Sequence, residues 1–400
     1  MNSVRFTSCT LVFGLLAACS AGPRGETAVL VDTPFPVVWQ EAAAEPYTPA
    51  PHPEWQRRPP ARVGMDPVRL QHAVNFAVQN ETGWPTDLRA ALEESLATGE
   101  YGEIVGPVKD RGGQAGVIVK DGYLVAEWGD LERVDMTFSV TKSYLSTTAG
   151  LALDSGLIAA LHDPVVSYAP GIGFEGRRNS SITWHMLLNQ TSEWRGDLWG
   201  KPDVADRREG KDRELQPPGT FWEYNDVRVN QTAFALLHLW NEPLPGVLEE
   251  LVMDRIGASG TWTWHGYQNS YLELDGERVQ SVSGGGHWGG GMWINTLDQA
   301  RFGLLFLRGG EWEDREILSP EWVEMATTPT GIKPVYGYMW WLNTGRQLYP
   351  SAPESSFFAL GAGSNVIWID PDHDLVAVLR WIDGQAVDGF IERVLAALEP

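Results

Sequence analysis

The sequence predicts an α+β fold. Strands from both ends of the chain should form one antiparallel sheet flanked by helices, with a mostly α-helical subdomain inserted between them. Two observations support this: strand-like runs occur at 115–128 and return only at 336–381, and the region from about 157 to 310 contains short helical stretches and glycine clusters without a long strand run. The chain has 400 residues, of which 43% are hydrophobic, and this is ample material for a core.

The N-terminus has the pattern of an export signal. Residues 1–10 carry one cation, Arg5, and residues 11–18 form an apolar run too short to span a bilayer. The run ends in Leu16-Ala17-Ala18-Cys19, which resembles a bacterial lipobox. We expect residues 1–18 to be a lipoprotein signal peptide and Cys19 to be lipidated. An ordinary secretory peptide with a coincidental cysteine is the alternative.

A lipidated Cys19 implies an exported protein anchored to the cell envelope. Lipid would be its membrane contact, and Ser20 after the cysteine favours the periplasmic side of the outer membrane. Cys9 would leave with the signal, so no disulfide is expected. Residues 19–63 are rich in proline, alanine and acidic residues, as in a semi-rigid tether, and residues 64–400 should form the folded domain.

The domain should begin with two helices and a hairpin. Asp66 is a suitable N-cap and Pro67 a suitable first residue for a helix reaching about residue 78, and a second helix is expected over 86–98. Asp121-Gly122 separates two β-rich runs at 115–120 and 123–128, which is a strong signal for a type I′ hairpin.

Residues 139–155 read as a helix closed by Gly156. Further strands are expected near 336–342, 364–370 and 375–381, and a final helix over 385–398.

Composition excludes several function classes. The net charge of −22 argues against a nucleic-acid partner. The chain has no G-x-S-x-G, no H-E-x-x-H and no P-loop, so we expect no metal and no cofactor. The sequence does not indicate an oligomeric state.

Ser139 and Lys142 form the one S-x-x-K of the chain, because none of the other five lysines has a serine three residues before it. Residues three apart share a helix face, and an amine held against a hydroxyl can activate it as a nucleophile. In a chain of this composition and length, one such motif occurs by chance with a probability of about one half. The neighbouring sequence must therefore support a catalytic role for it.

Those surroundings resemble the serine β-lactamase-like hydrolases over about residues 64–400. The resemblance rests on the hairpin before S-x-x-K, the stretch ITWHMLLNQTSEW at 182–194, Pro218-Gly219-Thr220 before Tyr224, and IDPDHDLVAVLRW at 369–381. The group includes class C β-lactamases, D-alanyl-D-alanine carboxypeptidases, carboxylesterases and 6-aminohexanoate-dimer hydrolase. It implies a β-lactamase/transpeptidase-like fold.

The resemblance implies roles for individual residues. Ser139 would be the nucleophile, Lys142 its base partner and Tyr224 a proton shuttle. Gly361 and Ala362 match the family's inner-strand motif, so the N–H groups of Ala362 and Ser139 would form the oxyanion hole.

Two positions depart from the family pattern. Asp226 stands where an asparagine is usual; it either holds Lys142 charged or points away and pairs with Arg228. Ala359 stands where a cation usually holds a substrate carboxylate, unless Arg380 or His287 substitutes. This loss favours a carboxylic ester or small amide as substrate.

A glycine-rich run at 283–291 contains His287 and Trp288. These two residues could contact substrate from a mobile wall, or the run could be a turn that allows close backbone passage. His185 and His373 read as structural. A larger set of tryptophans could line the cleft or pack in the core: Trp194, Trp199, Trp340 and Trp341.

The expected function is that of a serine hydrolase acting through an acyl-enzyme on an ester or small amide. One alternative is a penicillin-binding D,D-peptidase or weak β-lactamase. Another is a catalytically inactive binding protein of the envelope.

Overall fold

A computed structural model describes residues 47–97 and 99–398. The predicted signal peptide, Cys19 and most of the predicted tether lie outside the described residues. Within the described part of the chain, no helix has the length and apolar character needed to cross a membrane.

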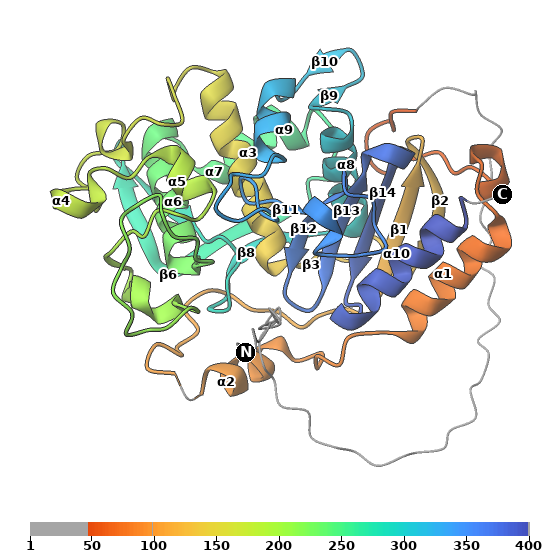
Figure 1. Ribbon diagram of the computed structural model, residues 1–400, viewed down its shortest axis with the longest axis horizontal. Helices are drawn as coiled ribbons and strands as arrows, with labels where there is room; N and C mark the ends of the chain where they lie inside the picture. Colours follow the sequence, from red (N-terminus) through yellow and green to blue (C-terminus); the bar gives the residue numbers. More distant parts are fainter. Residues whose placement is uncertain (1–46, 98, 399–400) are drawn as a thin grey trace, which may run out of the picture. The chain divides into compact units, whose positions relative to one another are not determined.

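Strands from both ends of the chain form a six-stranded sheet, as predicted (Figure 1). Its order is β11-β12-β13-β14-β1-β2, and every neighbouring pair is antiparallel. The strands are β1 (Ala115–Lys120), β2 (Tyr123–Trp128), β11 (Trp341–Leu342), β12 (Phe357–Gly361), β13 (Asn365–Asp370) and β14 (Leu375–Arg380). Pairing of β1 with β14, with Ile118 opposite Ala377, joins the two ends of the chain.

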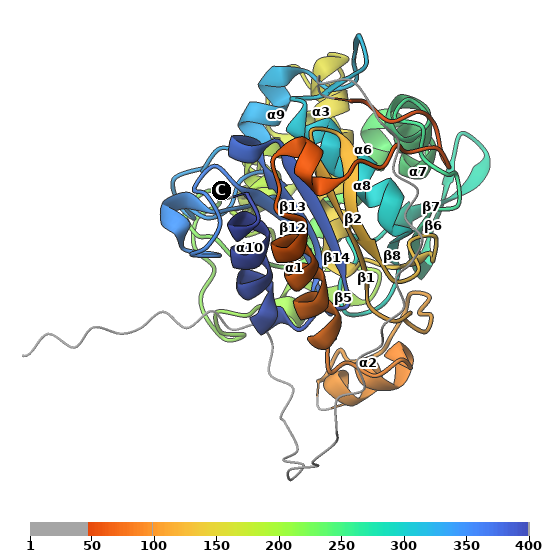
Figure 2. The ribbon, with the colours of Figure 1, turned by 90° about the vertical axis from the view of Figure 1, so that its right-hand side faces the viewer.

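Two helix layers cover the sheet. Helices α1 (Pro67–Gln79) and α10 (Val387–Ala396) lie on one face (Figure 2), where Ile118 is buried with Phe390. Helices α3 (Thr141–Asp154) and α8 (Thr296–Leu307) share the other core with Val117 and Val119. The alternation along β1 is the two-residue period of a strand buried on both faces.

Local signals at the start of the domain are confirmed. Asp66 caps α1 by accepting hydrogen bonds from the N–H groups of Val68 and Arg69 at 2.8 and 3.0 Å. Helix α2 is Leu88–Leu96, within the predicted range. Asp121 and Gly122 both have positive φ, as a type I′ turn requires.

Residues 47–63 already pack on the domain. Trp55 is buried and its indole N–H donates to the Gly122 carbonyl at 2.8 Å, and Tyr47 stacks on Tyr123. A 3₁₀ turn, η1 (Pro60–Val63), follows. The described part of the segment that composition predicted as a tether therefore contacts β2, because its few aromatic residues find apolar partners there.

The inserted region contains several helices, as predicted, but also a long strand that the sequence did not predict. A second sheet has four strands: β3 (Asp135–Met136), β8 (Gly291–Ile294), β6 (Thr263–Leu274) and β7 (Glu277–Val282), in that order. Strand β6 is 12 residues long. The pairing of β6 with β7 shifts register between Gly266 and Tyr271, and many of its side chains are exposed. Both features weaken the apolar alternation by which a strand is predicted.

Two late elements also differ from prediction. Of the strand expected at 336–342, only Trp341 and Leu342 belong to β11, and Tyr336 forms an isolated bridge. No bounds were predicted for strand β12, which ends at Gly361.

The remaining elements of the described chain are η2 (Phe138–Val140), η3 (Val165–Ser167), α4 (Gly176–Asn179), α5 (Trp184–Leu188), β4 (Asp197–Leu198), β5 (Lys201–Pro202), η4 (Asp203–Asp206), α6 (Asp226–Trp240), α7 (Leu244–Leu248), η5 (Glu249–Met253), β9 (Glu311–Trp312), β10 (Arg315–Glu316), α9 (Pro320–Ala326), η6 (Thr344–Arg346), η7 (Pro371–His373) and η8 (Gly384–Ala386).

Candidate active site

Ser139 lies in η2, the short turn that leads into α3. Residues 135–138 and 140–152 are all buried, and Ser139 between them is partly exposed. Phe138 before it has φ of 49°, a left-handed conformation that is uncommon for a bulky side chain. Such conformations cost free energy and occur often at functional sites. The fold thus exposes the Ser139 residue at the N-terminal end of an otherwise buried helix.

The Lys142 side chain is 1% exposed and is surrounded by acceptors. Its Nζ donates to Ser139 Oγ at 2.9 Å and to the Gly284 carbonyl at 3.2 Å. An ion pair places the same Nζ 2.7 Å from Asp226 Oδ1. The predicted Ser–Lys pair is therefore in contact, and three oxygens lie around the ammonium group.

Asp226 is the first residue of α6, and its side chain is 3% exposed. Of the two predicted alternatives for Asp226, the structure shows the pairing with Lys142, while Arg228 instead contacts Glu193 at 2.8 Å. Burial disfavours the charged carboxylate, but Lys142, a hydrogen bond from His287 and Arg208 together hold the pKa of Asp226 well below its usual range. Asp226 therefore provides a negative charge behind Lys142.

Tyr224 lies over the same group. Lys142 Nζ is 4.9 Å from the centre of its ring, and the Tyr224 hydroxyl has a hydrogen bond with Ser139. Burial raises the pKa of Tyr224, and the charge of Asp226 raises it further, against the opposing effect of Arg208. The phenol is therefore neutral near pH 7. The structure brings Ser139, Lys142 and Tyr224 together as the sequence predicted.

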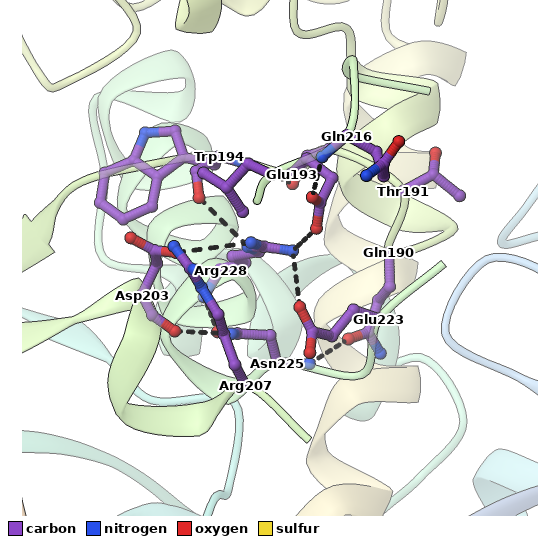
Figure 3. Close-up of polar contacts among 12 residues, drawn as sticks. Gln190, Thr191, Glu193, Trp194, Asp203, Arg207, Gln216, Glu223, Asn225 and Arg228 are labelled. Atoms are coloured by element: carbon purple, nitrogen blue, oxygen red, sulfur yellow. Dashed lines mark hydrogen bonds and ion pairs between the residues drawn. The ribbon is translucent and has the colours of Figure 1, made fainter. Parts of the chain in front are cut away.

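A buried ion-pair network holds the loop that carries Tyr224 (Figure 3). Its central pair is Arg228 and Glu193, and Glu193 also binds Arg213 at 2.6 Å. Glu223, just before Tyr224, contacts both arginines. Asn225, just after it, donates its backbone N–H to Gln190 Oε1 at 2.8 Å. This network is not predictable from the sequence, because charged residues scattered along the chain carry no sign that they are buried together.

The end of β12 lies against η2. A Cβ built on Gly361 would come within 2.0 Å of the Thr137 carbonyl oxygen and 3.2 Å of the Ser139 nitrogen, so only glycine fits there. Ala362 follows at an exposed position, and its carbonyl accepts a hydrogen bond from Asn365 at 2.8 Å. The two segments expected to supply the oxyanion N–H groups are therefore neighbours.

A substitute for the missing cation is not found in Arg380. Ala359 is buried in β12, and all three guanidinium nitrogens of Arg380 donate to protein oxygens, namely Asn365 Oδ1 and the carbonyls of Ile294 and Met136. Burial lowers the pKa of Arg380 to about 10. Arg380 is thus a structural residue, unable to reach a substrate without losing these bonds.

The glycine-rich run packs tightly on the nucleophile turn. A Cβ on Gly285 would lie 2.1 Å from the Phe138 carbonyl, which supports the close-passage alternative. His287 is 28% exposed and its Nδ1 lies 3.3 Å from Asp226 Oδ2. Trp288 is 1% exposed and its indole N–H donates to the Tyr101 carbonyl at 2.8 Å, so of the two alternatives the structure favours packing over substrate contact for this residue. An indole this deeply buried is core.

The other aromatic candidates divide between core and site. Trp194 and Trp340 are buried, and Trp199 packs on Phe234 and Tyr267. Trp341 is half-buried and stacks on Tyr224 with ring centres 5.8 Å apart. His185 pairs with Tyr338 at 2.7 Å and His373 with Asp370 at 2.7 Å, in agreement with structural roles.

The carboxylates of Asp206 and Asp226 and the His287 ring bring three potential metal-ligand atoms within 4.8 Å of one another. Cationic side chains already face these carboxylates: Lys142 lies at 2.7 Å from Asp226, and Arg208 at 3.5 Å from Asp206. Within this part of the described chain, protein cations therefore balance the charge that a metal would balance.

Known proteins share this fold. An uncharacterized protein of Alkalihalophilus pseudofirmus is 23% identical over 266 residues, which is 63% of this chain and 74% of that protein. The crystal structure of a penicillin-binding protein homologue from Caulobacter crescentus matches with a TM-score of 0.55 and 15% identity, over 79% of this chain and 99% of that one. A D-stereospecific amidohydrolase from Streptomyces sp. matches with a TM-score of 0.52 and 16% identity, over 84% and 98%.

At these identities the solved structures establish the fold, a mixed helix and antiparallel-sheet architecture of the β-lactamase/transpeptidase type. The family follows from the sequence itself. Residues 104–383 match the family model Beta-lactamase, and because this match spans most of the chain, the protein belongs to the Beta-lactamase family within the serine β-lactamase-like superfamily of hydrolases.

Proposed function

We propose that this protein is a serine hydrolase that cleaves a carboxylic ester or small amide through an acyl-enzyme on Ser139. The observation that carries the proposal is the 2.9 Å contact between Lys142 Nζ and the hydroxyl of Ser139, the partly exposed residue at the start of a buried helix. A buried ammonium group against a serine hydroxyl has no packing purpose and is costly to desolvate. Activation of the serine accounts for it.

The reaction would proceed in two halves. Ser139 Oγ attacks the carbonyl carbon, and its proton passes to the Lys142–Tyr224 group. The N–H groups of Ser139 and Ala362 stabilise the oxyanion, with help from the N-terminal end of α3. The proton then passes to the leaving alcohol or amine as the tetrahedral adduct collapses. Water repeats these steps on the acyl-enzyme and releases the acid.

Ester or amide substrates without a carboxylate near β12 fit the site best. Ala359 provides no charge, and Arg380 is fully engaged in hydrogen bonds. A charge-assisted contact to a substrate carboxylate, worth about 1.5–3 kcal/mol, is absent from both positions. This supports small esters and amides over D-alanyl-D-alanine peptides and β-lactams.

A fluorophosphonate probe tests the proposal. The purified protein should be labelled, Ser139→Ala should not be, and the exposed Ser181→Ala should be labelled like the wild type. An unlabelled wild type, or equal labelling of Ser139→Ala, would overturn the proposal. Hydrolysis of a chromogenic cephalosporin as fast as short acyl esters would overturn the substrate preference and favour the β-lactamase alternative.

We also propose that the protein is an envelope lipoprotein anchored through Cys19. The support is the Leu16-Ala17-Ala18-Cys19 motif, which lies outside the described residues. In cells fed a palmitate analogue, the wild type should carry the label and Cys19→Ser should not. Equal labelling of the two proteins would refute the anchor.

A further inference from the structure

The hydrogen-bond contacts of Lys142 and Tyr224 restrict which atom can accept the proton of Ser139. The inference drawn from them rests on the proposed function. Lys142 is held among Ser139 Oγ, the Gly284 carbonyl and Asp226 Oδ1, three acceptors that suit a fully protonated ammonium. A neutral amine has only two N–H groups, so it could not donate to all three oxygens. It would also leave the charge of Asp226 buried without its nearest cation. Lys142 in this site is therefore a proton donor and not a free base.

Tyr224 does not supply the missing base. Its pKa is raised by burial and by Asp226, so the phenolate that could accept a proton is disfavoured. It can pass on a proton only if it receives another at the same time. Among the groups that contact Lys142, Asp226 is then the one with an ionised acceptor.

Asp226 Oδ1 has an unusual environment. It is fully buried and lies 2.7 Å from Lys142 Nζ, and apart from this ion pair no donor among the described residues serves it. The other oxygen, Oδ2, faces His287 at 3.3 Å and Arg208 at 3.8 Å. Among the described residues, Lys142 is thus the cation that contacts Oδ1.

We propose that Asp226 is the terminal proton acceptor for activation of Ser139, with Lys142 as a relay that remains charged. One Nζ–H bond of Lys142 breaks and its proton forms an O–H bond on Asp226 Oδ1, which frees a lone pair on Nζ. In the same concerted motion the Ser139 O–H bond breaks and its proton forms an N–H bond with that lone pair, so Lys142 is charged before and after the step. The electron pair of Ser139 Oγ forms the bond to the substrate carbonyl carbon, and the negative charge moves from Asp226 to the oxyanion. On the way back, the proton returns to Nζ, and the Tyr224 hydroxyl, which gives up one proton as it receives another, delivers it to the leaving group.

Groups from several elements face Asp226 and set its charge. Lys142 of α3, Arg208 after η4 and His287 of the glycine-rich run are the cations or hydrogen-bond donors. Asp206 of η4 opposes them as a second acid and accepts the Asp226 backbone N–H at 2.6 Å. Two buried phenols also feel its charge: Tyr267 of β6 and Tyr336. The donors outweigh Asp206, so Asp226 is ionised at neutral pH and a proton that reaches it is readily returned.

The pH dependence of kcat/KM separates this relay from a free lysine base. With a short acyl ester and the wild-type protein, the relay predicts a profile that is level from about pH 6 to about pH 9, because Asp226 is ionised throughout. A free-amine base predicts a rise of about tenfold per pH unit over that range. This measurement needs no variant, so it decides even if substitutions at Asp226 impair folding.

Variants extend the test. Asp226→Asn should lower kcat/KM near neutral pH about 100-fold or more and convert the level profile to a rising one, because Lys142 must then lose its own proton. Asp226→Glu should restore a level profile with part of the activity. Asp66→Asn, the same chemical change at the exposed cap of α1, should match the wild type.

The outcomes distinguish the two proposals. A wild-type protein that is labelled by fluorophosphonate but shows the rising profile would overturn the relay and leave the hydrolase intact. Unchanged rate and profile in Asp226→Asn would also overturn it. A wild type that hydrolyses nothing and takes no label would instead overturn the hydrolase proposal itself.

Discussion

Tyr224 is held between an aromatic ring and two cations. Trp341 stacks on one side of it, and Lys142 and Arg208 lie 4.9 and 4.7 Å from its ring centre. The ring contacts fix its position, while the hydroxyl alone contacts Ser139. Removing the hydroxyl oxygen of Tyr224 should therefore abolish its contact with Ser139 while the ring stays in place.

Tyr224→Phe should keep the fold and lose activity. All ring contacts remain, so the melting temperature should change little, whereas loss of the proton-passing hydroxyl should lower kcat about 10²- to 10⁴-fold. Steady-state kinetics and thermal unfolding of the same preparation measure the two effects. An unchanged kcat would show that Tyr224 plays no part in proton transfer.

Gly361→Ala should misplace the oxyanion segment. The added methyl would meet the Thr137 carbonyl at 2.0 Å, so β12 and η2 must move apart at a cost of about 1–3 kcal/mol. We expect kcat for a short ester to fall at least tenfold, as when an oxyanion donor is misaligned. Gly83→Ala is the control, because no atom lies within 4 Å of its added Cβ. Equal activity in both variants would contradict the oxyanion assignment.

Local sequence motifs predicted part of this active site. Ser139, Lys142 and Tyr224 were found because S-x-x-K at a helix start and Pro-Gly-Thr before a tyrosine are local patterns. The direction of the Asp226 side chain was left open, since it depends on His287 and Arg208, which are distant in sequence. The role of Trp288 also stayed open between two alternatives, because the sequence does not show that its indole reaches the Tyr101 carbonyl.

At the scale of elements, the loop before α6 is held by buried charge. Glu193 accepts hydrogen bonds from Arg213, Arg228 and the backbone N–H of Gln216, at 2.6 to 2.8 Å. Asn225 caps α6 by accepting the Arg228 N–H at 3.1 Å. The helix start and the ion-pair network therefore position Tyr224 and Asp226 together.

Glu193→Gln should be strongly destabilising. It leaves two arginines facing a neutral amide, and breaking a buried ion pair costs about 3–5 kcal/mol. Glu93→Gln is the comparison: its pair with Arg89 is exposed and should be worth less than about 1 kcal/mol. Urea denaturation measures both free energies of unfolding. Equal values for the two variants would contradict a central role for the network.

The predictability of an element depended on how local its signal is. The β1–β2 hairpin and the α1 cap follow from Asp121-Gly122 and Asp66, which act through adjacent residues. Strand β6 was missed because its register shift and exposed side chains obscure the alternation of apolar residues. Strand β11 proved short, because the chain bends at 337–339 and brings Tyr336 back to pair with Trp341.

At the scale of the whole molecule, the antiparallel sheet from both chain ends was predicted, because strand-like runs occur early and late in the sequence with short helical stretches between them. The inward packing of residues 47–63 was not, since composition alone describes an extended segment there. Long-range pairing of β1 with β14 is what brings the β12 end beside η2. The site is therefore a product of the complete sheet.

Stability should depend on pH through the buried acids. Burial raises the pKa of Glu193, but hydrogen bonds from Arg213 and the charge of Arg228 outweigh this, so its pKa lies below 4.5 in the folded protein. A lowered carboxyl pKa stabilises the fold above the unfolded value and loses that effect as pH falls through the folded value. The stability gap between wild type and Glu193→Gln should thus be large near pH 7 and shrink below about pH 4. A gap that is constant with pH, measured by urea denaturation, would contradict this.

The central claim is that Ser139 forms an acyl-enzyme, and quenched-flow mass spectrometry tests it most directly. The protein is mixed with an excess of a short activated ester, quenched in acid, digested and sequenced by mass. The account predicts one acyl group per protein, located on Ser139 and lost on longer incubation, with none in Ser139→Ala. Turnover of the ester with no adduct on Ser139, or with the acyl group on another residue, would contradict it.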